Sequence, residues 1–183
     1  MRLVLSALVG LMSVVPVPSV MAQGGAKPKA GSILVFETVK GTFEIETYPS
    51  EAPKTVAHIV ELVRKRFYNG LRVHRVVPNF VVQFGDPQSR DMTKKAAWGT
   101  QSSGKPVGVV EFSKTLKHAV GMVSMAHPGD PAKADSQLFI VIGPASHLDG
   151  KHQLIGRVTT GMEAVRKLAA DDRIIRATVK GEK

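Results

Sequence analysis

Short runs of strand-forming residues, separated by turn signals, recur along almost the whole chain and constrain its fold more than any other feature. The run 41–47 alternates strictly, placing Phe43 and Ile45 on one face and Glu44 and Glu46 on the other. Further strands are predicted at 32–39, 71–77, 80–84, 109–112, 118–126, 137–142, 154–158 and 173–179. Because most runs are joined by turns, the sheet should be largely antiparallel, and closing it would remove exposed edges. The sequence therefore predicts a mainly β fold, a closed eight-stranded antiparallel β-barrel capped by two α-helices.

Two segments change to helical spacing. Ser50 stands where a helix cap is expected, and Pro53 follows near the first turn. Apolar residues at helical spacing then predict one helix over 51–66 and a second over 161–170.

The first 22 residues have the layout of a secretory signal peptide, with Arg2, an apolar run and short side chains before Ala22. The alternative is an uncleaved membrane anchor, but Pro16 and Pro18 interrupt the run, and a span needs about 20 apolar residues. We therefore expect a signal peptide over 1–22, a flexible lead-in over 23–31 and one domain over 32–183. The expected location is periplasmic or secreted, with no stable membrane insertion after cleavage.

The composition excludes several kinds of chemistry. The chain has no Cys, so it has no disulfide framework, thiolate nucleophile or Cys-ligated metal. Its formal net charge of +10 comes from basic residues that are scattered along the chain, which favours a solvated basic surface over specific nucleic-acid binding. Nothing in the sequence indicates more than a monomer.

The stretch LRVHRVVPNFVVQFGD, residues 71–86, places two polar side chains inside apolar strands. Residues two apart in a strand share a face, so Val73 is expected beside Arg75, and Val81 beside Gln83. If both faces point outward, a guanidinium and an amide lie at the rim of an apolar pocket floored by Phe80 and Val81. Such a pocket suits a small apolar ring attached to a peptide.

Several ordered motifs carry a resemblance to a known family. They are APKTV at 52–56, Y-x2-L-x-VHRVV-x2-FV-x-Q-x-GD at 68–86, GMVSMA at 121–126, SQLFI at 136–140, LDGKH at 148–152 and GRV at 156–158. In this order and spacing they resemble the cyclophilin-type peptidyl-prolyl cis-trans isomerases, of an exported bacterial kind. The resemblance runs from Ile33 to the C-terminus.

The resemblance implies a role for each matching residue. Arg75 would be catalytic; Phe80, Val81, Phe139 and Leu148 would line a proline pocket; Gln83, Gln137 and the backbone at Ala126 and His127 would hold the peptide; His147 and His152 would complete the site. The implied substrates are proline-containing polypeptides, with no cofactor and no metal.

The residue types suit that reaction. Amide resonance opposes rotation of a peptide bond by about 18–20 kcal/mol, and X-Pro bonds isomerise unaided in tens to hundreds of seconds. No bond is broken, so no nucleophile is needed. In the twisted transition state the prolyl nitrogen becomes a better acceptor, and a guanidinium aimed at it would lower the barrier. Lys lacks the planar fork that Arg75 supplies.

The chain departs from the family pattern in four places. Phe84 stands where a small residue is usual, His127 replaces an Asn, and His147 replaces the Trp of many members, which puts strong cyclosporin binding in doubt. The polar loop 87–108 lacks the usual Gly-Thr-Gly run. A loop of this length is often functional.

Other interpretations remain open. His147, Asp149 and His152 could hold a metal, although LDGK also reads as a turn. Ser124, His152 and Asp149 could form a hydrolase triad, but no G-x-S-x-G elbow exists.

Two further residues, and the function as a whole, each have two interpretations. His74 is expected to be a hydrogen-bonded, barrel-facing side chain rather than a base. Trp98 is expected to cover its own loop rather than to stack on nucleic acid. A non-catalytic binding module for Pro-containing segments is the alternative to an enzyme.

Overall fold

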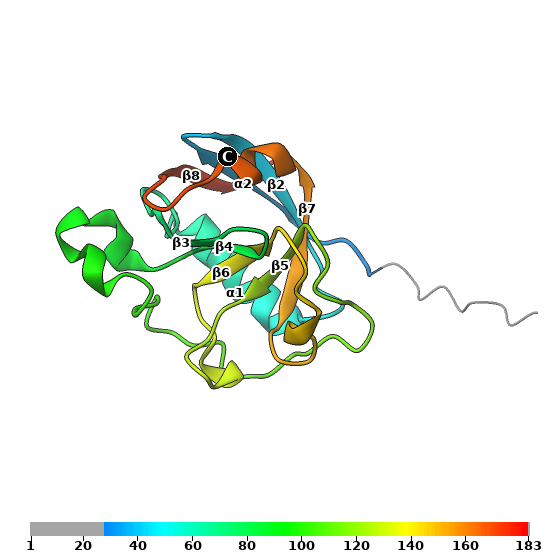
Figure 1. Ribbon diagram of the computed structural model, residues 1–183. Helices are drawn as coiled ribbons and strands as arrows, with labels where there is room; N and C mark the ends of the chain where they lie inside the picture. Colours follow the sequence, from blue (N-terminus) through cyan, green and yellow to red (C-terminus); the bar gives the residue numbers. More distant parts are fainter. Residues whose placement is uncertain (1–27, 183) are drawn as a thin grey trace, which may run out of the picture.

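The structure is a computed structural model that describes residues 28–182 of the chain. Eight strands form one antiparallel sheet in the order β3-β4-β6-β5-β7-β2-β1-β8 (Figure 1). The strands are β1 (Ile33–Thr38), β2 (Gly41–Thr47), β3 (Val73–Val77), β4 (Val81–Phe84), β5 (Met122–Met125), β6 (Leu138–Val141), β7 (Leu154–Thr160) and β8 (Ile174–Val179). The helices are α1 (Pro53–Arg64) and α2 (Met162–Lys167), with short 3-10 turns η1 (Pro87–Arg90), η2 (Met92–Ala97), η3 (Pro131–Lys133) and η4 (Ser146–Leu148). The predicted mainly β, antiparallel architecture is confirmed.

The sheet curls but does not close as a ladder of strands. An isolated bridge joins Arg72 and Arg173, the residues that directly precede its end strands β3 and β8. Backbone hydrogen bonds such as Ile174 N to Leu71 O (2.7 Å) reinforce this seam. The register of β3 against β4 shifts at His74, and such a bulge bends a strand. The predicted closed barrel is therefore wrong in this detail, and the sheet is open and curled.

The same bulge changes which side chains share a face of β3. Val73 is fully buried in the core, whereas Arg75 is exposed. The prediction that Val73 and Arg75 share a face is wrong, because the extra residue His74 reverses the alternation between them. Arg75 still points outward, as expected.

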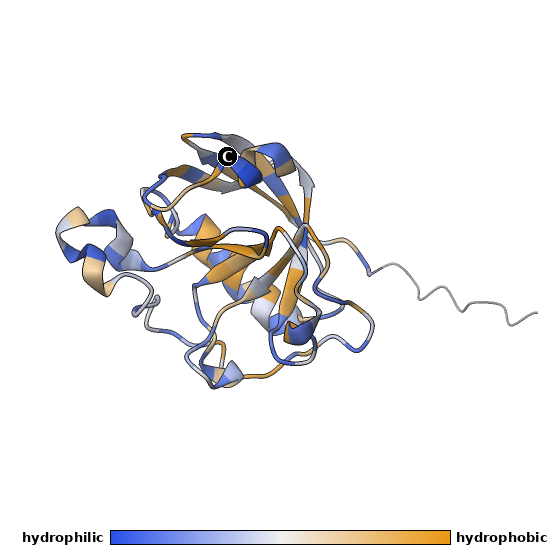
Figure 2. Ribbon diagram, in the orientation of Figure 1, coloured by the Kyte–Doolittle hydropathy of each residue, from blue (hydrophilic) through white to orange (hydrophobic). Residues whose placement is uncertain are grey.

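Aromatic rings fill the concave side of the sheet. Phe36 and Phe43 stack with their centroids 5.2 Å apart, and Phe84 packs against Phe36 at 5.4 Å. Tyr68 meets both Phe36 and Phe84 edge-on. Phe84 is thus a core residue, and Figure 2 shows the apolar residues gathered on this inner side.

The N-terminus of α1 is capped from a distant segment. Ala52 occupies the cap position and makes no side-chain bond there. Instead the Glu111 carboxylate accepts hydrogen bonds from Lys54 N (3.1 Å) and Thr55 N (2.9 Å). The expected Ser50 cap is therefore wrong, and so is the strand predicted at 109–112, which is irregular.

The helices frame the sheet at two sides. Val56, Ile59 and Val63 of α1 join the aromatic core, as does Val165 of α2. The segment of η1 and η2 projects from the body of the molecule, where it is drawn in green in Figure 1.

The predicted signal peptide, 1–22, and most of the lead-in, 23–31, lie outside the described residues. The first described residues already contact the domain, since Gly31 N donates to Thr47 O (2.8 Å). Among residues 28–182, no helix combines the length and the apolar character needed to cross a bilayer.

Candidate active site

A second apolar cluster lies on the convex face of the sheet, opposite the aromatic core. Strand β4 supplies both faces, because Val82 and Phe84 point into the core while Val81 and Gln83 point out. Phe139 of β6 pairs with Gln83 and packs in the outer cluster. An apolar cluster therefore lies outside the curled sheet, where the sequence predicts a binding surface.

This outer cluster surrounds a cavity of about 240 Å³. Its lining residues are Arg75, Phe80, Val81, Gln83, Ala126, His127, Phe139, Leu148 and His152. All of them were predicted as site residues. Two other predicted residues, Gln137 and His147, stand outside this lining.

Arg75 is held at the rim through a chain of side-chain amides. Its Nη1 donates to Gln83 Oε1 (3.2 Å), and Gln83 Nε2 donates to Gln137 Oε1 (2.9 Å). Gln137 Nε2 in turn donates to the carbonyl oxygens of Gly99 (2.9 Å) and Gln101 (2.8 Å). Gln137 thus links the rim of the pocket to the long loop, which explains its place outside the pocket.

Gln137 also lines a smaller cavity of about 130 Å³ beside the first. Gln83, Ala126 and His127 border both cavities, and Thr100 and Lys133 border only the smaller one. A peptide lying across the rim could therefore reach both.

Two buried carboxylates fold the loop that Gln137 contacts. Asp86, fully buried, accepts from the backbone N–H groups of Gly99 (2.6 Å) and Gln101 (3.1 Å). Asp135 accepts from Ser103 Oγ and from the Gly104 N–H (2.9 Å). The loop is therefore an ordered wall of the site.

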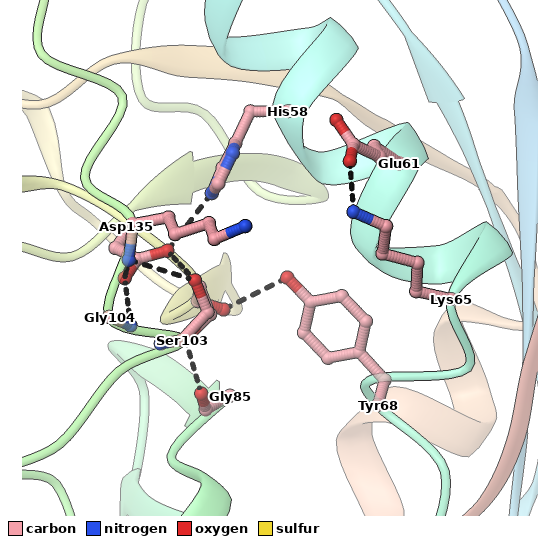
Figure 3. Close-up of polar contacts among 10 residues, drawn as sticks. His58, Glu61, Lys65, Tyr68, Gly85, Ser103, Gly104 and Asp135 are labelled. Atoms are coloured by element: carbon pink, nitrogen blue, oxygen red, sulfur yellow. Dashed lines mark hydrogen bonds and ion pairs between the residues drawn. The ribbon is translucent and has the colours of Figure 1, made fainter.

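Asp135 is also joined to α1, as Figure 3 shows. His58 Nε2 lies 2.9 Å from Asp135 Oδ1. The neighbouring Ser136 donates to Gly85 O (2.8 Å) and accepts from Tyr68 Oη at its carbonyl (2.9 Å). Sequence reasoning missed both carboxylates, since their partners are distant in the chain.

Two histidines stack at one wall of the larger cavity. The rings of His127 and His152 lie 4.4 Å apart at 28°. His152 Nδ1 is 2.9 Å from Met125 O, and His127 Nε2 is 3.0 Å from Lys151 O. Burial, together with the nearby His127, His118 and Lys151, lowers the pKa of His152, and its bond to Met125 only partly opposes this. The neutral form of the His152 ring is therefore favoured at pH 7.

His147 has a different place. Its ring stacks on Phe80, with centroids 5.2 Å apart and 26° between the planes. It therefore supports a lining residue from outside.

The structure excludes the hydrolase triad that was considered as an alternative. Ser124 lies beside His118, with Oγ 3.1 Å from Nε2, and its side chain is fully buried. His118 Nδ1 lies 2.9 Å from Asp149 Oδ1. His152 instead bonds to Met125 O, so Ser124, His152 and Asp149 form no triad, and a buried Ser cannot meet a substrate.

The remaining alternatives are also resolved within the described residues. No group of three or more potential metal ligands occurs there, so His147, Asp149 and His152 do not form the metal site that was considered as an alternative. Trp98 Nε1 donates to Asp91 O (3.1 Å), within its own loop, as predicted. His74 is largely buried beside Gln137, and neither of its ring nitrogens makes a hydrogen bond of good geometry among the described residues.

Residues 33–180 match the sequence model of the family described as "Cyclophilin type peptidyl-prolyl cis-trans isomerase/CLD". The chain belongs to the cyclophilin family. It is a cyclophilin-type peptidyl-prolyl cis-trans isomerase. A relative from Aspergillus fumigatus named "Peptidyl-prolyl cis-trans isomerase-like 1" is 36% identical over 161 residues, covering 81% of this chain and 96% of that protein. A probable peptidyl-prolyl cis-trans isomerase from Brucella abortus is 34% identical over 178 residues, covering 90% and 89%.

Solved cyclophilin structures have the same fold. The crystal structure of a Cryptosporidium parvum cyclophilin-type isomerase aligns with a TM-score of 0.70 at 22% identity, over 83% of this chain and 99% of that one. A cyclophilin from Hirschia baltica aligns with a TM-score of 0.66 at 23% identity, over 84% and 77%. The open, curled sheet described above is thus arranged in the cyclophilin manner.

Proposed function

We propose that this cyclophilin accelerates X-Pro rotation in unfolded or flexible exported proteins, with Arg75 stabilising the transition state. The observation that carries the proposal is the position of Arg75. Its guanidinium borders a cavity whose other walls include Phe80 and Phe139.

The apolar part of the cavity fits the prolyl ring. Phe139 is 4% exposed and Val81 2%, so the floor is built from side chains fixed in the sheet. A five-membered ring bound there has its nitrogen at the polar rim, where Arg75 and Gln83 lie. In the relative from Cryptosporidium parvum, one structure was determined in the presence of the dipeptide Ala-Pro.

The electrostatic argument concerns a nitrogen that changes character. In a planar amide the prolyl nitrogen donates its lone pair to the carbonyl and accepts hydrogen bonds poorly. Twisting the bond returns that lone pair to the nitrogen. A fixed donor such as Arg75 then binds the twisted form more strongly than either planar form, which lowers the barrier.

The rest of the peptide would be held beside the ring. Gln83 and Gln137 form one side of the rim, and the backbone at Ala126–His127, where β5 has just ended, forms another. His152 completes the wall, and His147 supports Phe80 from outside. The reaction needs no cofactor and no metal, and one chain supplies the whole site, so we propose that the protein acts as a monomer.

Assays with an X-Pro peptide test the proposal. The domain 32–183 should accelerate isomerisation, Arg75→Ala should abolish most of that acceleration, and Arg75→Lys should restore little of it. If the wild type binds the peptide without acceleration, the protein is instead a binding module. If Arg75→Ala is as active as wild type, the mechanism is wrong.

Export rests on the N-terminal segment and is tested separately. The layout of residues 1–22 supports cleavage after Ala22 and a periplasmic or secreted location. N-terminal sequencing of the protein recovered from the cell envelope or the medium should begin at Gln23. A chain that still starts at Met1 would contradict this.

A further inference from the structure

His118 lies directly behind the proline pocket without lining it. Its side chain is 1% exposed. Its ring stacks on Phe139, with centroids 6.0 Å apart and 18° between the planes. One face of the imidazole therefore supports the floor of the pocket from beneath.

On its Nδ1 edge, the same ring is bonded to the turn that forms a second wall of the pocket. Nδ1 and the backbone N–H of His118 both meet Asp149 Oδ1, at 2.9 and 2.8 Å. Asp149 directly follows Leu148, a lining residue. Lys117 Nζ lies 3.8 Å from the second oxygen of this carboxylate, Oδ2. The hydrogen bonds to His118 thus fix the turn that carries Leu148.

The Nε2 edge reaches a third wall. Nε2 lies 3.1 Å from Ser124 Oγ, which also lies 2.9 Å from Gln153 O. Gln153 is fully buried and directly follows His152. Ser124 therefore lies between His118 and the segment that carries His152, and its single hydroxyl proton serves either His118 Nε2 or Gln153 O.

We propose that His118, paired with Asp149, is the positioning residue of the proline pocket, setting the distance between its floor and its two walls. The His118 ring packs on Phe139, is bonded to Asp149 beside Leu148, and lies against Ser124 next to the segment that carries His152. None of its atoms lines the cavity. It acts on the fit of the prolyl ring and leaves the chemistry to Arg75.

This proposal rests on the proposed function and makes a distinct kinetic prediction. Loss of the His118 hydrogen bonds loosens the walls, so substrate binds more weakly, whereas the Arg75 donor is unchanged. The KM for an X-Pro peptide should rise on the order of tenfold, with kcat changed by less than about twofold.

The variants separate positioning from general destabilisation. His118→Phe keeps the ring on Phe139 and removes both polar contacts. Asp149→Ala removes the carboxylate that is bonded to His118. The Asp149 side chain is 20% exposed, so this variant should fold even if His118→Phe does not. Asp149→Asn keeps an acceptor for the His118 N–H groups and should restore most of the wild-type KM.

Asn69→Ala is the matched control. It removes a hydrogen bond from Ala177 N (2.9 Å) at the far seam of the sheet, and its KM should equal that of wild type. Thermal unfolding of each variant shows that the assayed protein is folded.

The outcomes are distinguishable. A raised KM in His118→Phe and Asp149→Ala, with rescue by Asp149→Asn, supports the proposal. An unchanged KM in the folded variants overturns it, as does a fall in kcat alone or an equal KM rise in Asn69→Ala. A wild-type protein that accelerates no isomerisation would instead overturn the proposed function.

Discussion

Gln83 orients the guanidinium of Arg75 through a hydrogen bond of 3.2 Å, and the direction of that bond is fixed from behind. Gly99 and Gln101 present two carbonyl oxygens to Gln137, so the amide nitrogen of Gln137 must face them and its oxygen must face Gln83. Gln83 then has to turn its nitrogen to Gln137 and its oxygen to Arg75. The backbone of the loop thereby sets the orientation of the catalytic candidate.

Replacement of Gln83 tests this chain of amides. Gln83→Leu keeps the volume and removes the acceptor of Arg75, so kcat/KM should fall on the order of tenfold with little change in the melting temperature. Gln83→Glu should also lose activity, because its carboxylate would face the oxygen of Gln137. Peptide isomerisation and thermal unfolding of both variants give the answer. Wild-type activity in Gln83→Leu would show that Arg75 needs no orientation.

The pH dependence of activity should follow His152. Burial keeps its pKa below the ordinary histidine value of about 6.5, so the neutral ring persists to more acidic pH than in a free histidine. Protonation places a cation in the pocket wall beside His127, and kcat/KM should therefore decline only below about pH 6.5. The stability of the fold should also fall as the pH falls, because the unfolded chain binds that proton more readily.

His127→Asn provides the matched variant for this titration. Removing the neighbouring imidazole removes one cause of the lowered pKa, so the acid limb of the activity profile should move to higher pH. Lys151→Ala should move it in the same direction. NMR titration of the His152 ring checks the assignment directly. An acid limb that stays in place in both variants would assign it to another group.

Asp135 should contribute stability that depends on pH. Burial acts to raise its pKa, but hydrogen bonds from His58 and Ser103 outweigh burial, and the pKa lies below the ordinary aspartate value. A depressed pKa in the folded state gives stability that is present above the unfolded value, about 3.9, and is lost as the pH falls through the folded one. Asp135→Asn should thus be less stable than wild type at pH 7.

The test is the difference in stability between the wild type and Asp135→Asn. Chemical unfolding at pH 7 and at successively lower pH should give a gap in unfolding free energy that narrows below about pH 4. Taking the difference in unfolding free energy between the two proteins cancels the contribution of the other carboxylates, because these titrate in both. A gap that is constant with pH would mean that Asp135 stabilises the loop by shape alone.

The sequence predicted the parts of the site that follow from local patterns. Alternation along β4 correctly placed Val81 and Gln83 on the outer face. The bulge at His74 was not predictable, because one extra residue in a strand leaves the composition of the run unchanged. It reverses the side on which Val73 lies.

Contacts between distant segments were beyond reach for a different reason. Asp135 and Ser103 are 32 residues apart, and Glu111 caps a helix that begins 58 positions earlier. Neither carboxylate has a local motif that marks its partner. His118 was read only as part of a strand, since a buried ring behind a pocket leaves no signal in the spacing.

Phe84, the residue that departs most from the family pattern within 71–86, should prove to be a stability residue. Its ring is fully buried and contacts Phe36 and Tyr68 in the aromatic core, on the opposite face of β4 from Gln83. Phe84→Ala should cost about 3–5 kcal/mol of unfolding free energy because it leaves a cavity that fixed strands cannot fill. Phe84→Leu should cost less. The folded fraction of each should keep a kcat/KM near that of wild type, because Val81 and Gln83 keep their places. Denaturant unfolding and activity measured at low temperature separate the two effects, and a loss of activity in a fully folded Phe84→Leu protein would show that the core ring also shapes the site.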